Sequence, residues 1–446
     1  MTKKIIPTQK DEDGREWQTH PEIAERLAIH HLTGDRTKNP ETRPEIPAVT
    51  YGEVMDAIRK APKQSALGED DISSIILVSY HQAKPTTLWS ICRDILRTGR
   101  HPQGWKKAIV VPIPKANKAR YDQPKAGRSI HLLSVASKTL ERVVLSSIQK
   151  DENDDADDTL GLTQFGSRQN TGTSDTMKLL LELKKKAKQE GDKTLIMIAD
   201  VEEGFDKVNP EAFRHGWTKI KHGYIEWVYN WTQNRELQFR FKGKMDRTYT
   251  TNLVVPQGSP LSLYLFGAYF RDIMTGNEVD QEDQTLLMSY VDDVTICIRG
   301  KDESEIAMKG ARTWQDLKTR STNKGMDFAE NKTKSWHTDR AHRWHIGTLT
   351  TNLRFRGYWL ESKDDKNGNK GEDYRKHTQH WLTKANYTYN VLRALTQRTS
   401  EGLNTFACLR LLHSVTRTIG WYGLEFYIHI TDKTREIDSF LYEATK

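Results

Sequence analysis

The chain has 446 residues, carries a formal net charge of +8 at neutral pH, and has a mean hydropathy of -0.74. Because no apolar run approaches the roughly 18 residues needed to cross a bilayer, the sequence excludes an integral membrane protein. The start of the chain lacks the apolar core of a secretory signal, and the three cysteines are scattered. We therefore expect an intracellular protein of the nucleus or the cytoplasm, not a secreted one, without structural disulfides.

The first part of the chain is predicted to be polar and then helical. Residues 1–45 are rich in turn-forming residues, and we expect them to pack loosely. Thr50 and Glu53 form a capping-box pattern that predicts a helix to about Ala61. Helical periodicity continues over residues 73–98, 132–149 and 173–190.

Positive charge is concentrated in residues 101–150. This window holds ten Lys and Arg residues against two acidic residues. The concentration predicts a surface that faces phosphates, although a solvated helix face would have the same composition. We expect Lys106, Lys107, Lys115 and Lys118 to belong to that surface.

Acidic residues follow apolar strand patterns at two places. Residues 194–199 read as a buried strand that ends in Asp200, a common way of placing a metal ligand at the mouth of a sheet. Asp292 and Asp293 lie between two apolar runs, 286–288 and 294–298, which predict a hairpin with the doublet at its tip. Adjacent carboxylates repel each other and lose hydration, and a bound magnesium ion would offset that cost.

The doublet alone is as compatible with a surface turn as with a metal site, because short motifs give many false positives. Asp200 at the end of another strand favours the metal site. Between the two acidic positions lies a loop rich in Pro and Gly, residues 256–262, which leads into an apolar helix-like stretch over 263–269.

These three segments resemble motifs A, B and C of reverse transcriptases, in particular those of non-LTR (LINE-type) retrotransposons. The family patterns are approximately D-x-x-x-A-F-D, P-Q-G-S-P-L-S and Y-x-D-D, and they correspond here to residues 200–206, 256–262 and 290–293. Flanking segments are similar to the family as well: W-K-K-A at 105–108, I-P-K at 113–115, S-K-T-L-E-R at 137–142, Q-F-G-S-R at 164–168, Lys332-Thr333 and F-R-G at 355–357.

The resemblance implies an α+β right-hand polymerase fold with fingers, a palm whose antiparallel sheet is backed by helices, and a partial helical thumb. It divides the chain into a polar N-terminal segment (1–45), fingers (46–175), a palm with motifs A to E (176–360) and a thumb-like helical segment (361–446). Residues 363–373 are rich in charge and glycine and predict an exposed connection to helices over 381–395 and 405–427.

The activity that the resemblance implies is RNA-directed DNA polymerisation, in which dNTPs are added to the 3′-hydroxyl of a DNA or RNA primer on an RNA template. Two Mg²⁺ ions, or Mn²⁺ in their place, would be bridged by Asp200 and Asp292. Asp293 would be a supporting ligand and the Val201 carbonyl a further one. Lys332, in motif D, would protonate the departing pyrophosphate. No membrane partner is implied, and the oligomeric state is left open.

The nucleotide-binding residues that the resemblance implies lie in several motifs. Lys115 and Arg128 match basic residues that hold the triphosphate, each with a plain surface role as the alternative. Gln257 and Gly258 match the loop that packs against the incoming nucleotide. Phe205 matches the aromatic gate that excludes a 2′-hydroxyl, or is an ordinary core residue.

The chain departs from the family patterns at several positions. Gly204 stands where motif A has Ala, Arg356 where motif E has Leu, and Glu203 adds a charge that would repel a triphosphate. These departures keep open a second function, that of a retroelement-derived nucleic-acid-binding protein that is no longer catalytic. A viral RNA-dependent RNA polymerase shares the Asp doublet but lacks the aromatic gate, so Phe205 argues against it.

A cluster of His and Trp residues follows motif D. His337, His342 and His345 match no standard zinc spacing. Together with Trp336 and Trp344 they predict instead a basic, aromatic surface that contacts nucleic acid.

Overall fold

The computed structural model describes residues 49–397 with short gaps, together with residues 9–10, 16–17, 407, 410–420 and 422–423. The gaps are residues 64, 117–119, 122–125, 155–159, 162, 203, 217–221, 242, 253–254, 276–278, 281–284, 339–343 and 362–374. The chain forms two compact units. The first unit is Met1–Arg168, Val201–Thr275 and Thr319–Asp327, and the second is Gln169–Asp200, Gly276–Lys318 and Phe328–Lys446.

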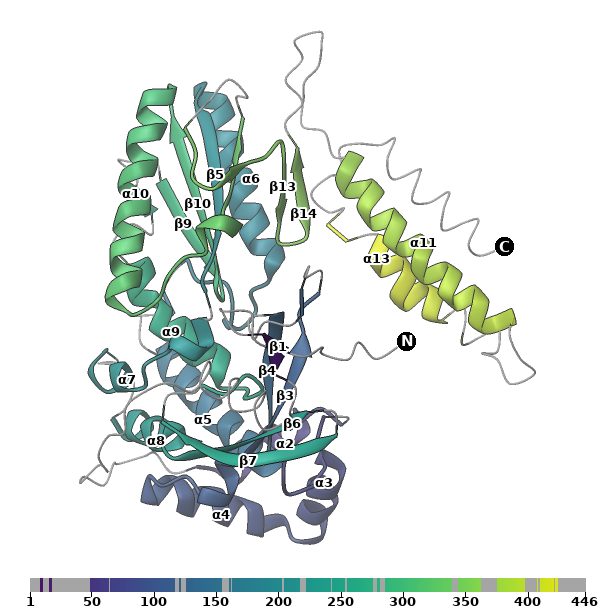
Figure 1. The fold of residues 1–446 in the computed structure, drawn as a ribbon. Coiled ribbons are helices and arrows are strands. Elements are labelled where there is room, and N and C mark those ends of the chain that lie inside the picture. The colour runs from purple at the N-terminus through teal and green to yellow at the C-terminus, as the bar shows by residue number, and fades with distance from the viewer. Residues whose placement is uncertain are drawn as a thin grey trace. The chain divides into compact units, whose positions relative to one another are not determined.

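The first unit is built from helices around a small sheet (Figure 1). Its helices are α2 (Tyr51–Arg59), α3 (Ser74–Ala83), α4 (Pro85–Thr98), α5 (Val135–Asp154), α7 (Glu211–Gly216), α8 (His222–Thr232) and α9 (Ser262–Met274), with short 3-10 turns η1 (Gln103–Trp105) and η3 (Gly204–Lys207). The capping box predicted for α2 is present, because Thr50 Oγ1 accepts from the Glu53 amide and Glu53 accepts from the Thr50 amide.

The sheet of the first unit has four strands in the order β4 (Gly127–Leu133), β3 (Ala108–Pro114), β6 (Arg235–Phe241) and β7 (Lys244–Thr251). Neighbouring strands are antiparallel except β3 and β6, which are parallel. A separate antiparallel pair joins β1 (Gln9–Lys10) to β2 (Glu16–Trp17). The sheet thus holds the 113–115 and 127–133 segments side by side.

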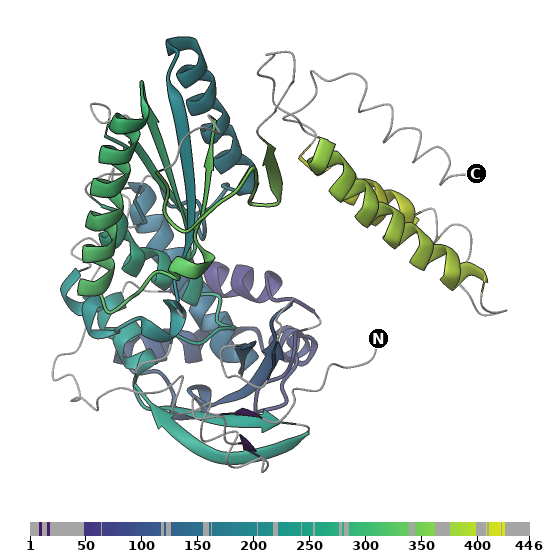
Figure 2. The same cartoon turned by 45° about the horizontal axis from the view of Figure 1, so that its top comes forward.

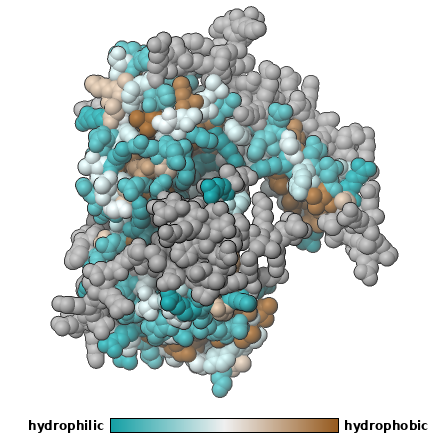
Figure 3. Space-filling view, viewed as in Figure 1, coloured by the Kyte–Doolittle hydropathy of each residue, from teal (hydrophilic) through white to brown (hydrophobic). Residues whose placement is uncertain are grey.

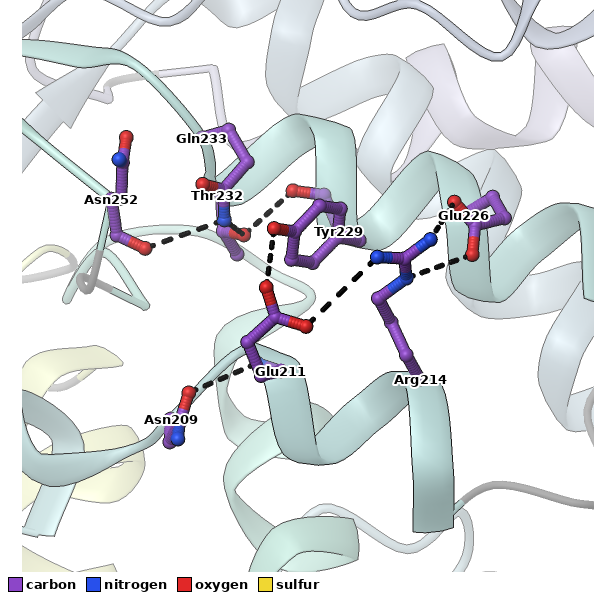
Figure 4. A network of polar contacts seen from close by, with 8 residues as sticks. All are labelled: Asn209, Glu211, Arg214, Glu226, Tyr229, Thr232, Gln233 and Asn252. Atoms are coloured by element: carbon purple, nitrogen blue, oxygen red, sulfur yellow. Dashed lines mark hydrogen bonds and ion pairs between the residues drawn. The ribbon is translucent and has the colours of Figure 1, made fainter. Parts of the chain in front are cut away.

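Two helices of the first unit are fixed to each other by a polar network (Figure 4). Arg214 on α7 donates from Nε to Glu226 on α8 at 3.0 Å, and the Tyr229 hydroxyl of α8 donates to Glu211 of α7. Glu226 is buried, so its charge needs this guanidinium partner. The network therefore has a structural role.

The second unit is centred on a six-stranded sheet (Figures 1 and 2). Its strand order is β12 (Thr348–Leu349), β11 (Lys334–His337), β5 (Lys193–Asp200), β10 (Asp293–Gly300), β9 (Thr285–Tyr290) and β8 (Val279–Asp280). All neighbours are antiparallel except β11 and β12. The apolar runs of β5, β9 and β10 are almost completely buried, as the sequence predicts for central strands.

Two helices cover this sheet. α6 (Thr173–Glu190) contacts β5 and ends at Gly191 in a left-handed conformation. α10 (Glu303–Asn323), whose last residues belong to the first unit, packs over β10 at Gly310, where a Cβ would lie 3.2 Å from Ile298. The 3-10 turn η4 (Glu330–Lys332) precedes β11.

The last described part of the second unit is a hairpin with helices beside it. The hairpin joins β13 (Asn352–Phe355) to β14 (Tyr358–Glu361), and the helical segments are α11 (Arg375–Gln397), the π-helical η5 (Leu412–Arg417) and α13 (Thr418–Gly420). Tyr358 stacks on His377 at 5.9 Å and lies 5.2 Å from Tyr422, ring centre to ring centre. The helix predicted over 381–395 is present, whereas the connection over 363–373 and much of 405–427 lie outside the described residues.

No described helix is long and apolar enough to cross a membrane. On the face seen in Figure 3, hydrophilic residues predominate among those described, and hydrophobic ones occur in small groups. Among the residues of α3 and α11 whose burial is described, Ile75 and Tyr387 are the most exposed large apolar ones.

Candidate active site

The predicted hairpin with the Asp doublet at its tip is present. Tyr290 of β9 pairs with Asp293 of β10, so Val291 and Asp292 form a two-residue turn. Val291 has φ of 60°, a conformation that costs a β-branched residue of order 1–3 kcal/mol and that such turns normally give to Gly. The buried strands on either side hold the turn in place and so project Asp292 from the end of the sheet.

Asp200 and Asp293 lie opposite each other on the neighbouring strands β5 and β10, because the antiparallel register pairs these two residues. Lys332 Nζ lies 2.7 Å from Asp200 Oδ2, and the Ala329 amide donates to the Asp200 carbonyl at 2.9 Å. The turn η4 is therefore fastened to the end of β5. The side chains of Lys332 and Asp200 remain partly exposed, at 46% and 33%.

Asp293 has a cationic partner of its own. Arg356, in the turn between β13 and β14, forms an ion pair with Asp293 Oδ2 and donates from Nη2 to the Asp293 carbonyl at 2.7 Å. The guanidinium also lies over the Tyr290 ring, 5.4 Å from its centre. The sequence marked Arg356 only as a departure from motif E and did not predict this contact.

The pKa values show how crowded this end of the sheet is. Burial, followed by the charges of Asp293 and Asp200, raises the pKa of Asp292 to about 6, although Arg356 opposes the shift. Burial and Asp200 also raise the pKa of Asp293. The Asp293 side chain is 49% exposed, so water still reaches part of the carboxylate and weakens this effect. Three carboxylates thus share a place that would be stabilised by further positive charge.

The donor set fits a divalent cation. Asp200 and Asp292 offer carboxylate oxygens, the donors that Mg²⁺ prefers, and a cation there would relieve the repulsion that raises the pKa of Asp292. Among the described residues, no group of three or more His, Cys, Asp or Glu side chains lies close enough together to hold a metal ion. Two of the three carboxylates are engaged by Lys332 and Arg356 instead. Val201, the other residue expected as a ligand, is buried.

Phe205, the residue that matches the sugar gate, lies in the first unit. Its ring stacks on Phe266 of α9 with 4.7 Å between ring centres and an angle of 22°. Phe266 is fully buried and stacks in turn on Phe270, while Phe205 is half-buried. The departure at Gly204 has its explanation here, because a Cβ at that position would lie 2.8 Å from the Phe266 ring. One face of Phe205 is therefore fixed against the core.

The Gln257–Gly258 loop is fastened to β4. The His131 amide donates to the Gln257 carbonyl at 2.8 Å. Gly258 has φ of 146°, and a Cβ there would lie 2.2 Å from the His131 carbonyl oxygen, so no other residue fits. Ser262, at the start of α9, closes the loop by donating to the Pro256 carbonyl at 2.8 Å.

Lys115 and Arg128 lie at the same end of the β3–β4 pair. The Lys115 amide donates to the Ala126 carbonyl at 2.8 Å, and Arg128 pairs with Ile113 in the sheet. Lys115 is half-buried and Arg128 is exposed. Glu203, which the sequence placed near the triphosphate, lies outside the described residues.

The prediction that Lys106 belongs to a phosphate-facing surface is wrong. Lys106 is only 4% exposed, and its Nζ lies 2.6 Å from the Asn230 carbonyl. Burial, with a smaller contribution from Arg235, lowers the pKa of Lys106 to about 8. Lys107 lies within 3.9 Å of Glu69 and Glu236. Charge counting missed these pairings, because the partners come from distant parts of the chain.

The predicted aromatic surface is wrong for Trp336 and His337. Trp336 and His337 are 2% and 4% exposed, because β11 is an inner strand of the sheet. Lys184 of α6 covers the Trp336 ring at 4.7 Å from its centre. Trp344 packs on α10 where Gly310 leaves room for its ring, and His342 lies outside the described residues. The rings of Trp336, His337 and Trp344 are therefore part of the packing of the second unit, whereas His345 is exposed.

Comparison with known proteins identifies the family. The chain matches the family described as reverse transcriptase (RNA-dependent DNA polymerase) over residues 113–382. Among solved structures it is similar to apo telomerase from Candida tropicalis truncated from its C-terminal domain, with a TM-score of 0.41, 14% identity and coverage of 58% of this chain and 54% of that one. The chain thus spans about half of the telomerase chain. No curated protein matches.

The family match confirms the predicted α+β right-hand polymerase fold and the enzyme class of the matched domain, a nucleotidyltransferase. The match covers more than half of the chain and includes the three carboxylates at the end of the sheet together with Lys332 and Arg356. The chain therefore belongs to the reverse transcriptase family.

Proposed function

We propose that this protein is the RNA-directed DNA polymerase of a non-LTR (LINE-type) retroelement, which adds dNTPs to a primer 3′-hydroxyl by a two-metal mechanism. The observation that carries the proposal is the placement of three carboxylates at one end of a buried sheet. Asp200 and Asp293 are register partners, and Asp292 projects from the turn beside them with its pKa raised to about 6. Such a group is stabilised by divalent cations, which reverse transcriptase domains use.

The residues of the chain have distinct roles in this proposal. Bound Mg²⁺ or Mn²⁺ supplies the charge that activates the primer hydroxyl and neutralises the phosphates. Asp200 and Asp292 hold the cations, and Lys332 keeps a proton on Nζ for the leaving pyrophosphate. Phe205, whose half-buried ring is fixed on one face by Phe266, is the gate that excludes a 2′-hydroxyl in this proposal.

The binding residues complete the proposal. Gln257 and Gly258, on a loop fastened to β4, pack against the incoming dNTP, and Lys115 and Arg128 hold its triphosphate. The RNA template, the DNA or RNA primer, a nuclear or cytoplasmic location and the four segments from residues 1–45 to 361–446 remain predictions.

Primer extension on an RNA template, with dNTPs or NTPs and Mg²⁺, tests the proposal. We expect dNTPs to be preferred and Asp292→Ala to abolish extension while template binding persists, because the carboxylate is removed but the binding surface is untouched. Asp56→Ala is the matched control, since Asp56 is an exposed carboxylate on α2 whose side chain is 66% exposed. Undiminished extension by Asp292→Ala would contradict the site, and a preference for NTPs would favour an RNA polymerase.

One observation favours a second function. Lys332 and Arg356 already engage two of the three carboxylates, as a non-catalytic nucleic-acid-binding protein would tolerate. The same assay separates the two functions, because such a protein would bind the RNA–primer duplex in a salt-dependent manner without extending it.

A further inference from the structure

We infer that Arg356 occupies the place of a metal ion at Asp293. Arg356 is in this view a positioning residue that holds the second carboxylate of the doublet, and Asp200 and Asp292 alone are left to bind divalent cations. The inference rests on the proposed function, since it assigns the ligands of the same site. It changes the role expected for Asp293 from supporting metal ligand to partner of an arginine.

The contacts of Arg356 fix Asp293 through two different atoms. The guanidinium pairs with the carboxylate and also donates to the main-chain carbonyl of the same residue at 2.7 Å. The Arg356 side chain is 4% exposed, whereas that of Asp293 is 49% exposed. A buried fork held at two points is a fixed charge, not a surface arginine that samples many partners.

The main chain of Arg356 is held just as firmly. Phe355 pairs with Tyr358, so Arg356 and Gly357 form a two-residue turn with φ values of 48° and 91°. Such turns favour Asn-Gly, and an arginine at the first position is strained unless its side chain is stabilised elsewhere. The Tyr422 hydroxyl donates to the Arg356 carbonyl at 3.0 Å.

A comparison of Lys332 with Arg356 shows why a metal ion would displace only the lysine side chain from its carboxylate. Lys332 is 46% exposed and contacts Asp200 as a single point charge on a flexible stem. A divalent cation with its larger charge can replace it there. Arg356 is buried and held through its main chain, so its positive charge stays at Asp293 and disfavours a second cation on that carboxylate.

Direct measurement of Mn²⁺ binding to the full chain tests the inference. Free Mn²⁺ is followed by electron paramagnetic resonance without nucleic acid or nucleotide, so that the readout does not depend on activity. We expect Asp292→Asn to weaken Mn²⁺ binding by about tenfold or more, as removal of a charged ligand does, and Asp293→Asn to change it by less than about threefold. Equal weakening in the two variants would overturn the inference.

A double-mutant cycle then shows whether Arg356 is the cause. Arg356→Leu, the residue of the family pattern, should free Asp293 and strengthen Mn²⁺ binding by about tenfold, and Asp293→Asn should cancel that increase. Arg356→Lys keeps the charge but not the fork, so it should strengthen Mn²⁺ binding less than Arg356→Leu does. A folding defect in the leucine variant would weaken Mn²⁺ binding and so could not imitate the expected increase. An increase that survives Asp293→Asn would contradict the inference.

Failure of the proposed function gives a different result. If Asp292→Asn and Asp200→Asn both leave Mn²⁺ binding unchanged, the carboxylates do not form a metal site, and both the function and the inference fall. If those two variants weaken binding and Asp293→Asn weakens it equally, the metal site stands and only the role of Arg356 is refuted.

Discussion

At the scale of single residues, the end of the six-stranded sheet that carries the three carboxylates combines several unfavourable features. Val291 holds a positive φ that suits glycine, and Asp292 is half-buried beside two other carboxylates. Each feature destabilises the fold taken alone, and together they occur at a turn where the sequence predicted a metal site. Strain and charge crowding of this kind are typical of functional sites.

The raised pKa of Asp292 makes a prediction about stability. Its pKa is about 6 in the folded protein against an ordinary 3.8, so the folded state favours the protonated carboxyl. That contribution to stability is complete below the ordinary value and is lost as the pH rises through about 6. In the metal-free protein, the melting temperature of the wild type should therefore fall relative to Asp292→Asn between about pH 4 and pH 7.

Added Mg²⁺ should close the gap in melting temperature at pH 7, because a cation replaces the proton. Asp56→Asn, at an exposed position on α2, is the control and should follow the wild type at every pH. If the melting temperatures of wild type and Asp292→Asn change with pH in parallel, the pKa of Asp292 is not raised by burial and by the neighbouring carboxylates.

At the scale of elements, the sequence predicts those helices and strands whose pattern is set by residues close together in the chain. The apolar runs 286–288 and 294–298 predicted the hairpin, and the structure has strands Thr285–Tyr290 and Asp293–Gly300 there. The helix predicted over 73–98 is two helices, because Pro85 cannot donate an amide and begins a new one. The helix expected from 132 begins at Val135, since residues 127–133 alternate in burial as a strand.

Local sequence patterns could not predict the cationic partners of Asp200 and Asp293. Lys332 is 132 residues from Asp200, and Arg356 is 63 residues from Asp293. Their contacts depend on how the sheet and the β13–β14 hairpin are brought together, which no local pattern encodes. The family resemblance placed Lys332 near the site but had Leu where Arg356 stands.

The hairpin that carries Arg356 is tied to the helical segment beside it. The Tyr422 hydroxyl donates to the Arg356 carbonyl, and Trp381 Nε1 of α11 donates to the Gly357 carbonyl at 3.2 Å. Tyr422→Phe should lower the free energy of unfolding by about 1 kcal/mol, the worth of one such hydrogen bond. Thermal melts measure the decrease, with Tyr387→Phe as the control because Tyr387 is 72% exposed.

The bond from Tyr422 goes to the main chain, and this makes the prediction specific. The cost of Tyr422→Phe should persist unchanged in the Arg356→Leu background, because leucine keeps the same carbonyl. A cost that vanishes with the arginine would mean that Tyr422 acts on the side chain and not on the turn.

At the scale of the whole molecule, burial and ion pairing reduce the positive charge that is available to bind nucleic acid. The net charge of +8 and the basic window over 101–150 predicted a surface for nucleic acid. Lys106 is withdrawn from that surface and Lys107 is paired with Glu69 and Glu236, so part of the charge is already balanced within the protein. The remaining members still predict electrostatic binding of RNA.

The salt dependence of RNA binding distinguishes the two kinds of lysine. Replacing Lys115 and Lys118, of which Lys118 lies outside the described residues, together with Ala should lower the slope of log K against log salt by about 0.7 to 0.9 for each phosphate that the variant no longer neutralises. Lys106→Met should leave that slope unchanged and instead destabilise the fold, by about 1–3 kcal/mol, because the Asn230 carbonyl is deprived of its buried donor. A change of slope in Lys106→Met, or none in the double variant, would show that RNA is bound elsewhere on the molecule.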